Sequence, residues 1–89
     1  MLANKAIIEN FAAGKNSHNR NLESRGTRLI NYSTCLAQFY ANKLYINETK
    51  YSRSTSVVQN LVRKQFEGHK HVIFIKDVPK GSLYLASIV

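Results

Sequence analysis

The chain has 89 residues, and its 13 Lys and Arg against five Asp and Glu give a formal net charge of +8. A chain of this length forms a single domain, residues 1–89, and is too short to build a large enzyme cleft. The charge excludes an acidic mimic of DNA and favours a polyanionic partner. One cysteine excludes an internal disulfide framework and suits a reducing compartment.

The first predicted element is an amphipathic helix over residues 4–13. Ile7 and Phe11 recur at helical spacing, Asn4 is expected to cap the helix, and Gly14 follows at a usual stop position. Residues 15–27 are polar and rich in turn-forming types, so they are predicted to form a long loop with Leu22 as its one apolar anchor.

Three short runs rich in β-branched and aromatic residues follow, over residues 28–32, 35–40 and 43–48. Two residues, Ala41 and Asn42, separate the second run from the third, which is hairpin length. The runs therefore predict a three-stranded antiparallel meander. In the second run, simple alternation places Leu36, Gln38 and Tyr40 on one face of the sheet. It places Cys35, Ala37 and Phe39 on the other face.

A second helix is predicted over residues 52–66, where apolar residues recur at helical spacing. Ser56 and Gln59 match a weak capping box at its start. The expected buried stripe is Val58, Leu61, Val62 and Phe66.

Two strands are expected after this helix. Residues 71–77 contain a continuous apolar run and predict a buried strand, and residues 83–89 predict a last edge strand. An unpaired edge invites pairing with a second copy, so a homodimer is one expected assembly. The fold class is α+β, in the order α-β-β-β-α-β, with an antiparallel meander packed by two helices.

The chain shows no run typical of export or membrane insertion. The apolar stretch 6–8 is too short for a signal peptide, and residues 83–89 fall far below the roughly 20 that a spanning helix needs. A cytoplasmic location in the cell that makes the protein is therefore expected.

Residues 46–60 read Ile-Asn-Glu-Thr-Lys-Tyr-Ser-Arg-Ser-Thr-Ser-Val-Val-Gln-Asn. This string resembles one shared by a family of small proteins from bacteriophages and other mobile elements. That string runs approximately Ile-Asn-x-Thr-Lys-Tyr-Ser-x-x-Thr-Ser-x-x-Gln-Asn and is followed by basic residues, a place that Arg63 and Lys64 fill here. Relatives often carry His where this chain has Val58, so no duty of that His transfers. The resemblance implies a phage origin and no particular activity.

The start of the second predicted helix is the most chemically suggestive segment. A helix N-terminus attracts anions, and Ser54, Thr55 and Ser56 follow the cations Lys50 and Arg53 there. The alternative is that the hydroxyls only cap the helix.

A distributed basic surface is the second candidate site. Lys and Arg neutralise phosphates, and exposed Tyr or Phe stack on unpaired bases. The alternative is that the aromatic residues form the core and the charge serves solubility. The candidate contacts to a partner or to nucleic acid are Lys15, Arg20, Arg25, Arg28, Lys43, Lys50, Arg53, Arg63 and Lys64.

The sequence offers no catalytic or metal-binding constellation. His69 and His71 lack further ligands at a suitable spacing, and Cys35 lies in a predicted strand, where an inert buried thiol is the commoner case. We therefore expect neither an enzyme nor a cofactor.

Two functions fit these observations. The first is an anti-defence inhibitor of the anti-CRISPR type, which would bind a host nucleic-acid-handling protein or its bound nucleic acid. The second is an accessory protein that contacts DNA or RNA phosphates directly. The helix–three strands–helix order is also similar in topology to the double-stranded-RNA-binding domain, but the dense Lys run of that domain is missing.

Overall fold

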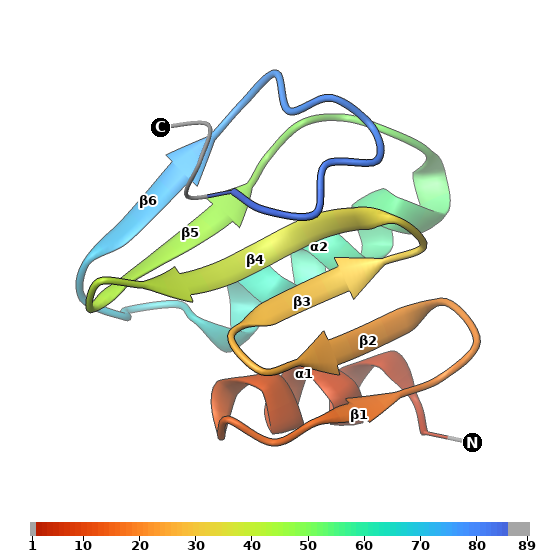
Figure 1. The fold of residues 1–89 in the computed structure, drawn as a ribbon, viewed down its shortest axis with the longest axis horizontal. Helices are drawn as coiled ribbons and strands as arrows, with labels where there is room; N and C mark the ends of the chain where they lie inside the picture. The colour runs from red at the N-terminus through yellow and green to blue at the C-terminus, as the bar shows by residue number, and fades with distance from the viewer. Residues whose placement is uncertain (1, 86–89) are drawn as a thin grey trace.

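The computed structural model describes residues 2–85, in which two helices pack on a six-stranded sheet (Figure 1). The elements are α1 (Asn4–Ala12), β1 (Ser17–His18), β2 (Leu22–Arg25), β3 (Arg28–Asn31), β4 (Thr34–Tyr40), β5 (Lys43–Asn47), α2 (Arg53–Gln65) and β6 (Val72–Ile75). The strands lie in chain order, antiparallel from β1 to β5, and β6 pairs with β5 in parallel. The predicted α+β class is confirmed. The predicted order was incomplete, because two strands precede the meander and the sheet is mixed.

The segment 15–27 is not the predicted loop, since it contains β1 and β2. Leu22 is buried as expected, and the Ser24 hydroxyl donates to the carbonyl of Lys15 over 2.8 Å. The Asn19 side chain accepts hydrogen bonds from the backbone N–H groups of Asn21 and Leu22 and so closes the turn. The turn-forming residues thus serve hairpin ends, while pairing with β3 supplies the backbone partners of β2.

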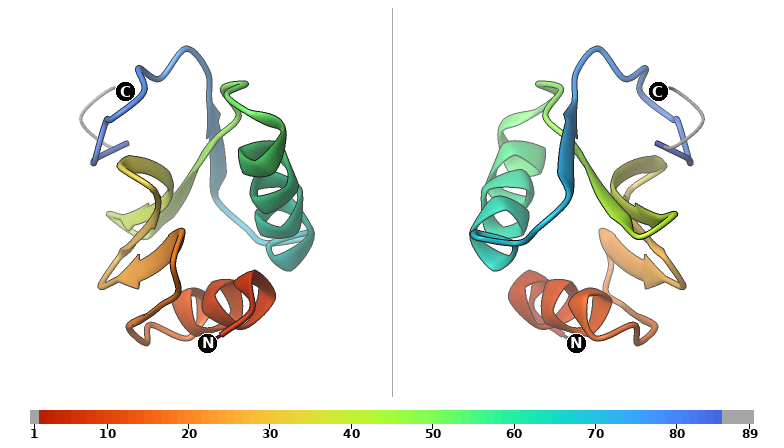
Figure 2. Two further views of the ribbon diagram at one scale, coloured as in Figure 1. Left: turned by 90° about the vertical axis from the view of Figure 1, so that its right-hand side faces the viewer. Right: turned by 90° about the vertical axis from the view of Figure 1, so that its left-hand side faces the viewer.

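Both helices cover the same face of the sheet (Figure 2). Asn4 does not cap α1: Ala3 occupies the cap position, and Asn4 Oδ1 instead accepts from Asn19 Nδ2 over 2.7 Å. That bond ties α1 to the β1–β2 turn. The helix-side core consists of Ile7, Ile8, Phe11, Leu22, Leu29, Leu36, Ala37, Leu44, Ile46, Val58, Val62 and Phe66.

Helix α2 closely matches its prediction. Val58, Val62 and Phe66 are buried, and Leu61 packs partly buried against the same core. The proposed capping box is wrong, because Ser52 caps the helix by accepting from the Thr55 N–H. The Gln59 side chain is used elsewhere: it donates to the carbonyls of Asn47 and Thr49, each over 2.9 Å.

Strand β4 breaks the predicted alternation. The β3–β4 register shifts between Leu29 and Ile30, so Leu36 and Ala37 both pack on the helix side while Cys35 packs on the opposite face. A bulge places two consecutive residues against one partner and thereby resets which side chains share a face.

The face away from the helices, called the outer face below, is partly covered by residues 76–85. The Cys35 N–H donates to the carbonyl of Ser82 over 2.7 Å, and the Leu85 N–H donates to Gln38 Oε1 over 2.7 Å. Residues 83–85 therefore do not form the expected strand, and the rest of that prediction lies outside the described residues.

Strand β6 is shorter than predicted and lies at the sheet edge instead of in its interior. Phe74 is 51% exposed, although Ile75 is buried on the outer side. Within residues 2–85, neither helix has the length and hydropathy to cross a bilayer.

Candidate functional site

Several turns and loops that carry basic residues lie at one end of the sheet, at the left of Figure 1. Strands β2 and β4 end there, and β3, β5 and β6 begin there, so the β2–β3 turn, the β4–β5 turn and the α2–β6 loop meet. Lys15 joins them, because Gly26 N–H donates to its neighbour Asn16 and Ser24 donates to its carbonyl. We call this set the basic end; its members are Lys15, Arg25, Arg28, Lys43, Lys64 and Lys70.

The basic end is poor in acids. In segments 13–17, 25–28, 40–43 and 64–71 of the described chain, Glu67 is the one carboxylate. Arg25 forms an ion pair with Glu23 over 3.0 Å, but both side chains are substantially exposed. Such a pair is weak in water, so Arg25 stays available to an anionic ligand.

Strand register puts an aromatic side chain among these cations. Arg25 pairs with Arg28, Arg28 with Gln38, and Tyr40 with Lys43. Directly paired residues share a face, as do residues two apart in a strand, so all five lie on the outer face. The Tyr40 side chain is 58% exposed there.

Arg28 is held in place by residues 83 and 84. Its guanidinium donates to the carbonyl of Leu83 over 3.0 Å and lies 4.3 Å from the ring centroid of Tyr84. A guanidinium that is stacked and hydrogen-bonded loses less side-chain entropy when it binds a further group.

Three of the four remaining predicted contacts lie away from the basic end. Arg20, Lys50 and Arg53 lie at the opposite end, beside the β1–β2 turn and the start of α2. Arg63 lies in the last turn of α2, near Lys64, and donates to Asn60. The sequence-predicted surface is therefore two groups of cations at opposite ends of the sheet.

Ser52, which lies just before the three residues predicted as an anion site, is the residue that caps α2. Thr55 is buried; its backbone N–H donates to Ser52 Oγ over 3.2 Å, and its hydroxyl donates to Asn31 Oδ1 over 2.9 Å. Ser56 N–H donates to the Ser52 carbonyl, and Ser54 Oγ lies 3.1 Å from Ser52 Oγ. The anion site at Ser54, Thr55 and Ser56 therefore stays a prediction.

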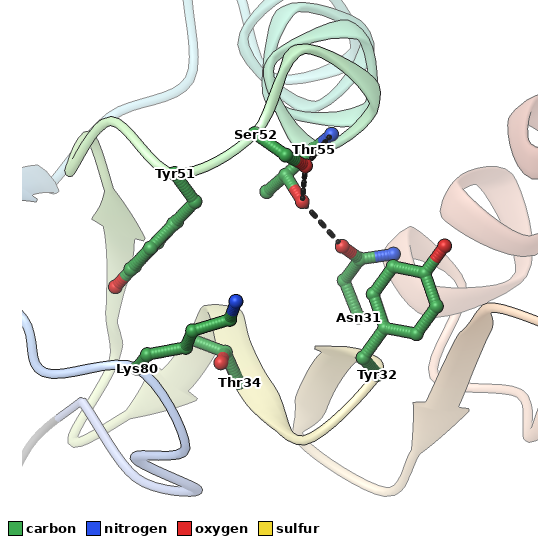
Figure 3. A pocket seen from close by; sticks show the side chains of 7 residues that line it. All are labelled: Asn31, Tyr32, Thr34, Tyr51, Ser52, Thr55 and Lys80. Atoms are coloured by element: carbon green, nitrogen blue, oxygen red, sulfur yellow. Dashed lines mark hydrogen bonds between the residues drawn. The ribbon is translucent and has the colours of Figure 1, made fainter.

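A hollow of about 260 Å³ opens beside the start of α2 (Figure 3). The Lys80 side chain reaches towards it from the 76–85 segment, and the Tyr32 side chain, 63% exposed, stands at its rim. Neither residue was predicted from the sequence to belong to a site. Lys80 reaches the hollow only because residues 76–85 run across the sheet. The lining residues are Asn31, Tyr32, Thr34, Tyr51, Ser52, Thr55 and Lys80.

Four polar residues of the string 46–60 hold the fold together, namely Asn47, Thr49, Tyr51 and Gln59. Asn47 Nδ2 donates to the Cys35 carbonyl and to the Tyr51 hydroxyl. That hydroxyl donates to the Val78 carbonyl over 2.6 Å, and Thr49 Oγ1 accepts from the Val78 N–H. Together with the two bonds of Gln59, these contacts fix the β5–α2 connection and dock residues 76–85 on it.

Two of the residues considered for chemistry, His69 and Cys35, pack against neighbouring groups. His69 lies against the rings of Phe39 and Phe66. Burial raises the pKa of the Cys35 thiol to about 12, although the charge of Arg28 and backbone hydrogen bonds act in the opposite direction. In the part of the chain that the structure describes, no three His, Cys, Asp or Glu residues come together as metal ligands.

Comparisons with protein-family models, with curated proteins and with solved structures found no match to this chain. The resemblance of residues 46–60 to phage proteins therefore stays a prediction.

Proposed function

We propose that this chain is a non-enzymatic binding protein that contacts nucleic-acid phosphates through the basic end of its sheet. The observation that supports the proposal is that Lys15, Arg25, Arg28, Lys43 and Lys70 all lie at one end of the described sheet, where Glu67 is the one carboxylate of the connecting segments and Glu23 pairs with Arg25. Neutralising phosphates with Lys and Arg releases counterions and gives affinity for any sequence. The proposed function requires that the protein be located where nucleic acid is accessible, such as the cytoplasm.

The test compares two double charge reversals that change the net charge equally. Lys43→Glu with Lys70→Glu alters the basic end, and Lys50→Glu with Lys76→Glu alters the opposite end. All four lysines are exposed, so both variants should fold. Fluorescence anisotropy with labelled DNA and RNA oligonucleotides, over a series of salt concentrations, measures the affinity of each.

The basic-end variant should lose about tenfold or more in affinity. The slope of log affinity against log salt concentration should become shallower, by the amount expected for the loss of about two phosphate contacts. The opposite-end variant should lose much less. Equal losses in both would show that only net charge matters and would overturn the assignment of the basic end. Undetectable binding of DNA and RNA by the wild type would overturn the proposed function itself.

The expected anti-defence role rests on the resemblance of residues 46–60 and stays a prediction. Its signature would be salt-tolerant binding to one purified host protein together with weak binding to free nucleic acid. The same salt series therefore separates the two functions.

A further inference from the structure

Building on the proposed function, we infer that the nucleic acid bound is single-stranded, with an unpaired base stacking on Tyr40 beside Arg28 on the outer face of the sheet. Positive charge alone does not distinguish a single strand from a duplex, whereas one exposed aromatic ring with cations on the same face favours unpaired bases.

Tyr40 stands where a base can reach it. It is the last residue of β4, 58% exposed, and its side chain shares the outer face with that of its strand partner Lys43. Arg28 pairs with Gln38, two residues before Tyr40, so the Arg28 and Tyr40 side chains are diagonal neighbours across β3 and β4. Such neighbours lie about 7–8 Å apart, a separation that long and aromatic side chains can bridge.

The cations flank the ring in the way a single strand requires. Lys43 and Arg25 lie on the same face as Tyr40, and Arg28 is held by the Tyr84 ring and the Leu83 carbonyl. A strand with one base on Tyr40 would present its phosphates to these cations. Aromatic stacking with flanking positive charge is the general mode of sequence-tolerant single-strand binding.

A duplex does not fit the same surface. Its bases are already stacked and paired, so the Tyr40 ring could meet only the phosphates and sugars of its outside. Major-groove reading needs a helix or a two-stranded ribbon that inserts into the groove, whereas Tyr40 stands on the face of a sheet. Stacking on Tyr40 therefore contributes affinity for unpaired bases alone.

The experiment measures affinity for a single-stranded oligonucleotide and for the duplex of the same sequence. The variant is Tyr40→Leu, its conservative partner is Tyr40→Phe, and its control is Tyr32→Leu, which removes a similarly exposed ring at the other end. Melting curves establish that each variant is folded. Tyr40→Trp supplies a second readout, since the protein has no other tryptophan.

We expect the wild type to prefer the single strand and Tyr40→Leu to lose about tenfold on it, with an unchanged salt slope because no charge is removed. Tyr40→Phe and Tyr32→Leu should bind like the wild type, and the Tyr40→Trp emission should be quenched by the single strand. Equal affinity for duplex and single strand, or wild-type binding by folded Tyr40→Leu, would overturn this inference. Either result leaves the Lys43/Lys70 test of the proposed function intact.

Discussion

The hydroxyl of Thr55 donates to Asn31 Oδ1 over 2.9 Å and joins the first turn of α2 to the end of β3 (Figure 3). Both side chains are buried, and Asn31 Nδ2 donates in turn to the Asn21 carbonyl over 3.0 Å. One chain of bonds thus connects the helix, β3 and the β1–β2 turn. Among the described residues, no buried side-chain nitrogen or oxygen lacks a partner, so this bond belongs to a fully satisfied polar layer.

Thr55→Val should therefore lower the free energy of unfolding by about 1–3 kcal/mol. Valine has the shape of threonine but leaves Asn31 Oδ1 buried without this donor, and an unsatisfied buried acceptor costs about that much. Urea denaturation followed by circular dichroism measures the change. Ser54→Ala, at an exposed neighbouring position, is the control and should stay within about 0.5 kcal/mol of wild type. Similar stabilities for the two variants would show that the Asn31 contact contributes nothing.

The aromatic cluster predicts where the core is sensitive. Phe11 is fully buried, and its ring centroid lies 5.0 Å from that of Phe39 and 5.9 Å from that of Phe66. Phe11→Ala should therefore lower the free energy of unfolding by about 3–5 kcal/mol. Phe74 lies on the edge strand and is 51% exposed, so Phe74→Ala should cost less than about 1.5 kcal/mol. Denaturant midpoints of the two variants check this ranking, and a larger loss for Phe74→Ala would contradict the assignment of β6 as an exposed edge.

Local patterns were enough to predict both helices and strands β3 to β5. The stripe of Val58, Val62 and Phe66 has helical spacing, and Gly14 and Gly68 adopt the positive φ values that end helices. The Ala41-Asn42 turn between β4 and β5 also has a local signature. Each of these features depends on residues that lie close together in the sequence, within about one or two helical turns.

Features set by distant contacts were not predictable. Residues 22–25 read as a loop because only pairing with β3 makes them a strand. Nothing near Val72–Ile75 in the sequence reveals that its far side is an edge, and the β4 bulge is a single irregularity that alternation cannot anticipate. The path of residues 76–85 depends on Gln38 and Tyr51, which lie far away in the chain.

The candidate site was predictable in composition but not in arrangement. Charge alone indicated Arg25, Arg28 and Lys43, and strand directions then bring them to the same end of the sheet. Arg20, Lys50 and Arg53 carry the same charge and lie at the other end, which no property of the residues themselves indicates. Lys70 was missed because its neighbours read as a simple helix-to-strand connection.

The β4–β5 turn offers a stabilising substitution. Ala41 has φ +53° and Asn42 has φ +64°, the pattern of a type I′ hairpin turn, in which alanine is strained by its Cβ. Ala41→Gly should raise the free energy of unfolding by about 0.5–1 kcal/mol, because relief of the strain exceeds the added entropy of the unfolded chain. Ala13, with φ −89°, is the matched control, and Ala13→Gly should not stabilise. A lower melting temperature for Ala41→Gly would contradict the left-handed conformation at residue 41.

The buried thiol predicts a pH dependence above neutrality. Burial raises the pKa of Cys35 from 9.0 to about 12, so between these values the unfolded chain loses a proton that the folded chain keeps. Ionisation of the thiol then favours the unfolded state. The contribution of the protonated thiol to the free energy of unfolding is therefore fully present below pH 9 and is lost as the pH rises towards 12. The stability difference between wild type and Cys35→Ala should therefore change in disfavour of the wild type by about 1.4 kcal/mol per pH unit within that window. All other groups are common to the two proteins, so the comparison isolates the effect of Cys35. Denaturant unfolding at neutral pH and near pH 10.5 measures the difference, and a constant value across the two conditions would mean that Cys35 ionises as easily in the folded protein as in the unfolded chain.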